Sequence, residues 1–459
     1  MRSAALLALV VVLTGCAGPV SNTRPEVTLP AQYGAAPEAT RVAIGADWWT
    51  LYNDAALNAL VDAALARNTD LLLAISRVDE TAALVGQARA AQWPELDLNG
   101  SATRSRTSTL NNQPIPQPVS SSFRLALATS FEIDLWGRLR NASAAAQQQL
   151  LAAQYARDTV KLALAASTAQ AYFALHALDA QLAVNGAALR SRGESLGLVE
   201  RRANGGLASP LEVAQARSAL AAIAAQRPDL QRQRSQLENQ LGLLIGQPGR
   251  TVAVDTALPI ALVAPPGLPS ELLDRRPDIA QAEALLRASR AQVEVVRAAM
   301  FPTISLTGLF GGQSADLGDL FKSGARIWSI GPSLLFPLVD GGRNAARTDQ
   351  AKAQAEAAAI SYQKAVQTAF RETADALVGT EQGARQELEV EKQLAAAREA
   401  LRIASRRYEA GYSGYLDVLD AQRNAQDAEL ALVRSRQARL DASVSLIKAL
   451  GGGWVAQAR

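Results

Sequence analysis

The stretch QWPELDLNG (92–100) returns 208 residues later as MFPTISLTG (300–308). Each copy has an aromatic residue, then a proline, then alternating residues that end in a glycine. The likeness extends upstream, because 11 of 34 positions match without a gap between residues 67–100 and 275–308. The chain is therefore predicted to contain two copies of one structural unit.

A second pair of segments supports this prediction. GLASPLEVAQARSAL (206–220) resembles GYSGYLDVLDAQRNA (411–425), now with an offset of 205 residues. A period near 200 residues is too long for a solenoid, so we interpret the chain as two copies of a half-protein. The Pro-rich stretch TALPIALVAPPGLPS (256–270) is the predicted linker between them.

Each copy begins with a predicted helix, over roughly 70–92 in the first copy and 277–299 in the second. A proline ends both helices, because the residue before proline is disfavoured in the α region and proline is tolerated at the first position of a strand. Each helix–strand joint is thus an aromatic residue followed by proline. The four joint residues are Trp93, Pro94, Phe301 and Pro302.

Two β-hairpins follow these joints, over about 94–134 and 302–337. Their strands alternate with period two; Leu96 and Leu98 face one way, and Glu95 faces the other. We expect strands of roughly ten residues with one apolar and one polar face. That length and pattern are typical of membrane β-strands.

Very long helices complete each copy, over about 137–246 and 342–450. No proline occurs between Gly137 and Asn204, and leucines recur at a heptad spacing in this stretch. A helix of sixty-odd residues is about 100 Å long at 1.5 Å per residue. Such a helix is longer than a compact domain needs, and we expect it to cross the periplasm. The heptad leucines are Leu175, Leu182, Leu189 and Leu196.

The first residues, MRSAALLALVVVLTGCAG (1–18), are typical of a secretory signal. The stretch ends in LTGC, which has the form of a bacterial lipobox, and Cys16 is the one cysteine of the chain. We predict cleavage before Cys16, with S-diacylglycerol and N-palmitoyl groups added to it. The alternative is a plain signal peptide with an accidental cysteine. Because Ala17 is not an aspartate, the predicted destination is the outer membrane.

The composition argues against catalysis. The chain has one histidine, His176, in an alanine-rich helical run, and its single cysteine excludes a disulfide or a Cys/His zinc cluster. It has no phosphate-binding loop. Basic and acidic residues number 46 and 43, and the basic ones are scattered, which gives no indication of nucleic-acid binding. We therefore predict a protein that is not an enzyme and has no metal and no cofactor other than the lipid.

Four strands cannot form a complete membrane structure. Within a bilayer every backbone N–H and C=O group must be paired, so a sheet has to close into a barrel. About eight strands make the smallest useful barrel. Several chains must therefore combine their strands, and both a dimer with eight strands and a trimer with twelve satisfy this requirement.

The sequence resembles the TolC/OprM-like outer-membrane efflux proteins, in the lipoprotein branch often labelled NodT. The resemblance covers essentially the whole mature chain, in the right order and twice. It implies a mainly α-helical homotrimer with a 12-strand β-barrel above an α-helical barrel. The segments that carry it, besides the helix–strand joints, are LTGC (13–16), FEIDLWGR (131–138), LLFPLVDGGR (334–343) and RRYEAGYSGYLDVLDAQ (406–422).

The resemblance also implies a function and partners. Such a trimer is the exit duct of a tripartite efflux pump in the outer membrane. A periplasmic adaptor and an inner-membrane resistance-nodulation-division transporter would supply drugs or other small toxic solutes, which the duct conducts passively. An alternative is the outer-membrane channel of a type I protein secretion system, which the sequence separates poorly from a pump.

The expected organisation has six parts. They are a signal peptide (1–15), a lipidated segment with an equatorial region (16–66), a first repeat (67–250), a linker (251–274), a second repeat (275–450) and a C-terminal tail (451–459).

The stretch 406–422 holds the candidate gate. Its glycines break the helix, Leu416 is expected to start the next one, and Asp417 and Asp420 share a face of its first turns. In one chain, acids near a helix N-terminus are equally well explained as solvated partners of the helix dipole. In a trimer, six such carboxylates would surround one axis and form a cation-selective constriction.

The resemblance assigns roles to these residues. The aspartates that match Asp417 and Asp420 form the periplasmic constriction in the family. A tyrosine matching Tyr408 and an acid matching Glu212 help to latch neighbouring helices. Some relatives have a basic latch residue where this chain has Ser413, so the latch is expected to be weaker or built differently.

Overall fold

The computed structural model describes residues 24–25, 27, 30, 44–108, 118–252, 258–262 and 271–455. Cys16 and the predicted signal peptide lie outside these residues. The chain divides into two compact units. The first contains Met1–Pro25, Arg77–Ala153 and Gln281–Gln363, and the second contains Glu26–Ser76, Gln154–Ala280 and Lys364–Arg459.

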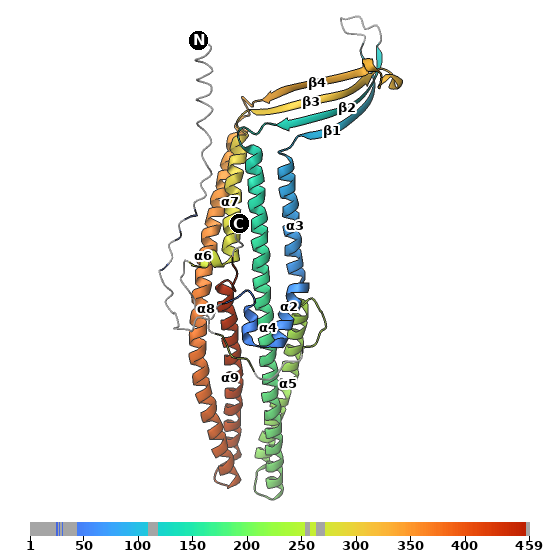
Figure 1. The fold of residues 1–459 in the computed structure, drawn as a ribbon. Coiled ribbons are helices and arrows are strands. Elements are labelled where there is room, and N and C mark those ends of the chain that lie inside the picture. The colour runs from blue at the N-terminus through green and yellow to red at the C-terminus, as the bar shows by residue number, and fades with distance from the viewer. Residues whose placement is uncertain are drawn as a thin grey trace. The chain divides into compact units, whose positions relative to one another are not determined.

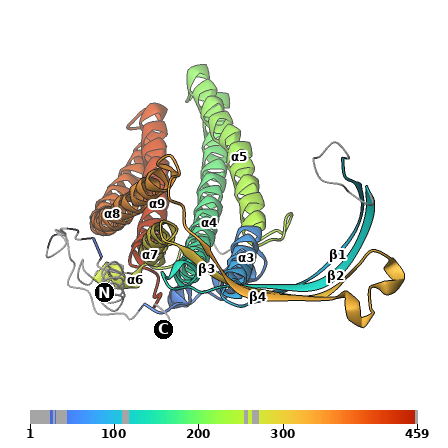
Figure 2. The ribbon, with the colours of Figure 1, turned by 90° about the horizontal axis from the view of Figure 1, so that it is seen from above.

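The first unit contains one antiparallel sheet, in which the strands follow the order β1-β2-β3-β4. Figures 1 and 2 show these strands side by side in a curved sheet. The predicted hairpins are both present, and pairing of β2 with β3 joins them. The strands are β1 (Glu95–Arg106), β2 (Val119–Glu132), β3 (Thr303–Ser314) and β4 (Arg326–Leu335), and two short 3-10 turns, η3 (Leu317–Asp319) and η4 (Ser323–Ala325), lie between β3 and β4.

The register places large apolar side chains in rows across one face of this sheet. Leu98 is opposite Leu127, Leu127 is opposite Phe310, and Phe310 is opposite Trp328, so one row crosses all four strands. Opposite residues in an antiparallel pair lie on the same face. All four side chains of this row are exposed. The alternation read from the sequence thus gives an apolar row that is continuous across the four strands.

The two helix–strand joints are built alike at the backbone but differ in their packing. Four residues separate the end of each helix, α3 (Thr69–Ala90) and α7 (Pro277–Ala298), from the start of the strand that follows it. Phe301 stacks on Trp136 with 4.7 Å between ring centroids, and the indole N–H of Trp136 donates a 2.8 Å hydrogen bond to the carbonyl of Pro302. Trp93 remains exposed. The predicted helix ends, 92 and 299, were two residues and one residue too late.

Long helices form most of the second unit and extend into the first. Two of them have 67 residues, α4 (Arg138–Asn204) and α8 (Arg343–Glu409), and two have 35 residues, α5 (Pro210–Leu244) and α9 (Tyr415–Ala449). Figure 1 shows α4 with α5, and α8 with α9, as two helical hairpins. Helix α5 continues through Pro228. Helix α9 begins one residue before the predicted Leu416.

No helix among the described residues has both the length and the apolar character required to cross a bilayer.

Equivalent contacts in the two repeats confirm the internal duplication. The side-chain amide of Asn68 donates to the carbonyl of Leu244 at 3.0 Å, where α5 ends. In the second repeat, Nη1 of Arg276 donates to the carbonyl of Ala449 at 3.1 Å, where α9 ends. In each repeat the residue before the 22-residue helix, α3 or α7, is therefore bonded to the end of the last helix, α5 or α9.

Short elements complete the second unit: η1 (Trp48–Tyr52), α2 (Ala55–Arg67) and α6 (Leu272–Arg275). Trp48 is buried, and the hydroxyl groups of Tyr52 and Ser443 lie 2.8 Å apart. The described start of the predicted C-terminal tail is packed, because the indole N–H of Trp454 donates to Asp158 Oδ2 at 3.0 Å.

Candidate functional site at the hairpin tips

The two long hairpins turn in the same way at their tips. Gly206 follows α4 with φ +72°, and Gly411 follows α8 with φ +81°. The amide of Leu207 bonds to the carbonyl of Arg202, and the amide of Tyr412 bonds to the carbonyl of Arg407. These are Schellman motifs, in which a glycine in the left-handed region lets the last helical carbonyls find partners.

An apolar cluster joins the two tips. It is formed by side chains from all four long helices, and Tyr408 and Tyr415 are its largest members, with ring centroids 5.4 Å apart. The tip of α8/α9 therefore packs directly on the tip of α4/α5. The buried members are Val199, Ala216, Tyr408, Tyr415 and Val418.

Tyr408, one of the two predicted latch residues, lies at the centre of this contact. Burial raises the pKa of its phenol, the nearby charge of Glu212 raises that pKa further, and Arg202 lowers it. The phenolic oxygen is buried and has no hydrogen-bond partner among the described residues. The ring of Tyr408, rather than its hydroxyl, makes the observed contacts.

Glu212, the other predicted latch residue, forms a capping box at the start of α5. Its carboxylate accepts a 2.7 Å hydrogen bond from the amide of Ser209, and the Ser209 hydroxyl accepts one of 3.2 Å from the amide of Glu212. Glu212 and Tyr408 thus lie in one region and interact through charge, but no direct hydrogen bond joins their side chains in the described chain. The S-x-x-E pattern that predicts this capping box is present in the sequence.

The predicted gate acids lie in the first two turns of α9, and both are exposed. Asp420 pairs with Arg423, with 3.2 Å between Oδ1 and Nη2. Asp417 is in the first turn, where Gly414 at the N-cap offers no side chain. The candidate gate therefore carries two acids and one base per chain. An i, i+3 search of the sequence would have found Arg423.

Arg202 is the residue of this region that sequence reasoning missed. Its guanidinium carbon lies 4.6 Å from the centroid of the Tyr408 ring, and Nη1 donates to the Tyr408 carbonyl at 2.9 Å. Arg202 is in the last turn of α4, 206 positions from Tyr408. No local pattern in the sequence predicts a contact between two residues so far apart.

The outer surface of the tips is apolar at equivalent positions of the two repeats. Leu207 and Tyr412 are 73% and 79% exposed, and Leu211 and Leu416 are 66% and 57% exposed. Large apolar side chains grouped on a surface mark an interaction site. Each tip therefore presents a matching pair of apolar side chains.

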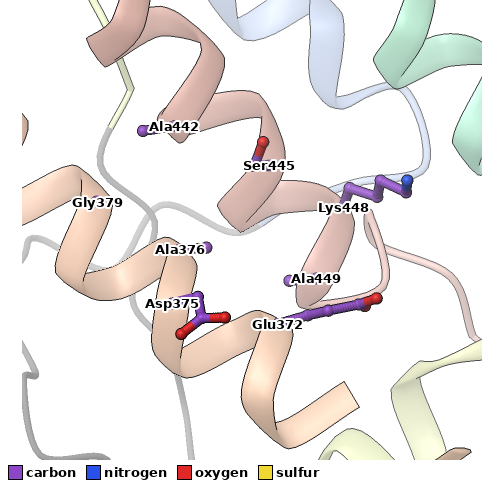
Figure 3. A pocket seen from close by; sticks show the side chains of 8 residues that line it. All are labelled: Glu372, Asp375, Ala376, Gly379, Ala442, Ser445, Lys448 and Ala449. Carbon is purple, nitrogen blue, oxygen red and sulfur yellow. The ribbon is translucent and has the colours of Figure 1, made fainter. Parts of the chain in front are cut away.

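A separate cavity of about 430 Å³ lies between α8 and α9, away from the tips. Figure 3 shows the polar lining residues, Glu372 and Asp375 on α8 and Ser445 and Lys448 on α9; the other lining residues are alanines and a glycine. Glu372 already has a partner, because Arg276 Nη2 lies 2.8 Å from its Oε2. No group of three or more His, Cys, Asp or Glu side chains suited to a metal ion occurs within the described residues.

The profile of the family described as "Outer membrane efflux protein" matches residues 60–247 and 268–452, which is most of the chain and both repeats. The chain belongs to the outer membrane efflux protein family. The family resemblance predicted from the sequence is therefore confirmed.

Individual relatives agree with this assignment. Outer membrane protein OprJ of Pseudomonas aeruginosa is 37% identical over 98% of this chain and 95% of its own length. Cation efflux system protein CusC of Escherichia coli is 33% identical over 96% of each chain. The solved open state of the MtrE outer membrane channel of Neisseria gonorrhoeae is 33% identical and has a TM-score of 0.83 over 94% of this chain and 97% of its own. The protein is an outer-membrane efflux channel, as the sequence predicted.

Proposed function

We propose that three copies of the chain combine their sheets into one 12-strand β-barrel and their long helices into an α-helical barrel. This trimer is the exit duct of a tripartite pump and conducts small toxic solutes or drugs passively. The chain performs no chemical step on its cargo and needs no cofactor beyond the lipid on Cys16.

The open sheet is the observation that carries this proposal. Among the described strands, β1 and β4 each pair with one neighbour, so each leaves one edge of backbone groups unpaired. The exposed apolar row suits a lipid environment, in which unpaired backbone groups are costly. Pairing β1 of one copy with β4 of the next satisfies both edges. Three copies give twelve strands, which leave a lumen, whereas eight strands fill with side chains.

The remaining parts of the proposal concern partners and anchoring. The exposed apolar residues of the tips, Leu207, Leu211, Tyr412 and Leu416, support docking of a periplasmic adaptor. That adaptor connects the duct to a resistance-nodulation-division transporter of the inner membrane. Lipids on Cys16 would anchor the start of the chain in the outer membrane, because each buried CH₂ adds about 0.8 kcal/mol.

The gate belongs to the same proposal. In the trimer, Asp417 and Asp420 of three chains line the constriction, and Tyr408 and Glu212 contribute to the contacts that keep neighbouring helices together. Arg423 offsets half of the acidic charge through its pair with Asp420. The constriction is therefore expected to prefer cations moderately.

Native mass spectrometry of the protein in lipid nanodiscs tests the assembly, and single-channel recording in planar bilayers tests conduction. We expect a mass of three chains and discrete conductance steps. A lone monomer, or trimers that conduct no ions, would contradict the proposal. A pull-down of the inner-membrane partner separates a pump from a type I secretion system.

A further inference from the structure

We propose that Arg202 is the residue that fastens the tip of the α8/α9 hairpin to the tip of the α4/α5 hairpin, and so sets how readily the channel opens. This inference rests on the proposed function, since it assigns a positioning role at the proposed gate. It concerns a residue that neither the sequence motifs nor the family resemblance singled out.

The first step is the contact itself. Arg202 uses two parts of its guanidinium on one target: the plane lies over the Tyr408 ring at 4.6 Å, and Nη1 donates to the Tyr408 carbonyl at 2.9 Å. Arginine suits this geometry because its planar group stacks on an aromatic face and still has donors at its edge. The contact links α4 to α8, which belong to different hairpins.

The second step concerns the carbonyl. Tyr408 is in the last turn of α8, where helix carbonyls lack intrahelical partners and carry partial negative charge. The carbonyl of Tyr408 also accepts from the amide of Gly411 at 3.0 Å within the Schellman turn. Arg202 therefore binds the end of α8 at the position where the chain turns toward the gate acids of α9.

The third step is that the contact does not use the Tyr408 hydroxyl. That oxygen is buried without a partner in the described part of the chain, and so is Nε of Arg202. Glu212, the predicted partner of Tyr408, has its carboxylate engaged by Ser209. The tips are thus held by a cation, a ring face and a main-chain carbonyl. This differs from a latch made by a tyrosine hydroxyl and a carboxylate.

The sequence offers a matched control. Arg201 is adjacent on α4 and exposed, and its side chain makes no hydrogen bond or ion pair with any described residue. Arg201→Gln removes the same charge from the same turn of helix without touching Tyr408. Any effect of net charge at the tip appears in both variants, whereas loss of the fastening appears only in Arg202→Gln.

The experiment records single channels of the full-length protein in planar bilayers. We expect the ratio of open to closed time to rise roughly tenfold in Arg202→Gln, because a charge-assisted hydrogen bond and a cation–π contact are both lost. Tyr408→Leu removes the ring but keeps the main-chain carbonyl that accepts from Arg202, so it is expected to give a smaller rise. Tyr408→Phe and Arg201→Gln are expected to gate like the wild type. Arg202→Lys keeps the cation without the planar fork and is expected to lie between wild type and Arg202→Gln.

A double variant keeps the inference testable. The double variant Arg202→Gln/Tyr408→Leu is expected to open no more than Arg202→Gln alone, because Arg202→Gln already removes both contacts. Additive effects, an Arg202→Gln channel that gates like Arg201→Gln, or a Tyr408→Phe channel that opens as readily as Tyr408→Leu each overturn the inference. Wild-type protein that forms no channel at all instead contradicts the proposed function.

Discussion

Asp420 and Arg423 form an ion pair, with 3.2 Å between Oδ1 and Nη2, on the first turns of α9. This pair means that the candidate gate is not purely acidic. Both side chains are more than half exposed, so the pair itself contributes little to stability, about 0–1 kcal/mol. The pair matters instead because Arg423 offsets half of the acidic charge at the constriction.

Replacement of both gate acids, Asp417→Ala with Asp420→Ala, is expected to leave trimer assembly intact and to reverse the ion preference. The double variant leaves Arg423 as the one charge of this trio, so the lumen changes from moderately cation-selective to anion-selective. Arg423→Gln leaves both acids without a compensating charge and is expected to make the lumen more cation-selective than in the wild type. Reversal potentials in a salt gradient measure the preference, and their sign is expected to change in the double variant.

A control for this experiment exists on α8. Asp349 is an exposed aspartate that pairs with Lys352 at 3.3 Å, also three residues along a helix. Asp349→Ala removes the same kind of pair without touching the candidate gate. If the double variant Asp417→Ala/Asp420→Ala has the same reversal potential as Asp349→Ala, then Asp417 and Asp420 do not line the gate.

Gly411→Ala is expected to destabilise the protein by about 1 kcal/mol, because a Cβ is disfavoured at its φ of +81°. Gly193→Ala is the matched control. Gly193 lies inside α4, and a Cβ there would meet nothing within 4 Å, so this substitution is expected to stabilise the helix by about 0.5–1 kcal/mol. Thermal unfolding of the two variants in detergent gives the comparison. Equal shifts in Tm would contradict the left-handed turn.

Asp441 is expected to make stability depend on pH. Burial raises the pKa of its carboxyl group from 3.8 to about 6, so the folded chain binds a proton that the unfolded chain releases. Stability from this group is therefore full below about pH 4 and decreases as the pH rises to about 6, by an amount of order 1 kcal/mol. Asp441→Asn removes this loss.

The test compares Tm at pH 4 and pH 8 for wild type, Asp441→Asn and Asp375→Asn, the last being an exposed aspartate on α8. We expect the pH-dependent difference in Tm to shrink in Asp441→Asn alone. If the pKa of Asp441 were ordinary, the difference between Tm at pH 4 and Tm at pH 8 would be the same in all three proteins, and the prediction would be wrong.

Cys16→Ala is expected to abolish incorporation of labelled palmitate while the channel still folds and conducts. The reason is that thiol and amino groups of the residue at this position receive the predicted lipids. Growth with labelled palmitate, followed by gel analysis of the purified protein, measures incorporation. Label that persists on Cys16→Ala would show that the lipobox interpretation is wrong.

Much of the fold follows from local rules in the sequence. Gly137 and the proline-free run to Asn204 predict α4, which spans Arg138–Asn204. Period-two alternation predicts the faces of the strands, because each strand must separate lipid-facing from polar side chains. Helix ends were less well predicted, since each aromatic–proline joint begins with two turn residues after the helix has ended.

Contacts between distant segments could not be read in the same way. The stacking of Phe301 on Trp136 and the position of Arg202 over Tyr408 depend on how separate helices and strands pack. A heptad pattern predicts which face of a helix is buried, but it does not predict which residue of another element packs against that face. Glu212 shows the reverse case, because the local S-x-x-E pattern predicts its capping box, whereas the family resemblance assigned it a distant partner.

The equal lengths of α5 and α9 restrict how this protein can change during evolution. Each spans 35 residues between a tip packed in the shared apolar cluster and an end fastened by Asn68 or Arg276. One inserted residue would turn everything beyond it by about 100° and advance it by about 1.5 Å, so one of the two attachments would break. Insertions and deletions are therefore expected to accumulate outside these helices. The offset between the repeats already changes across the β-hairpins, from 208 residues at the start of β1 and β3 to 205 at the start of α4 and α8.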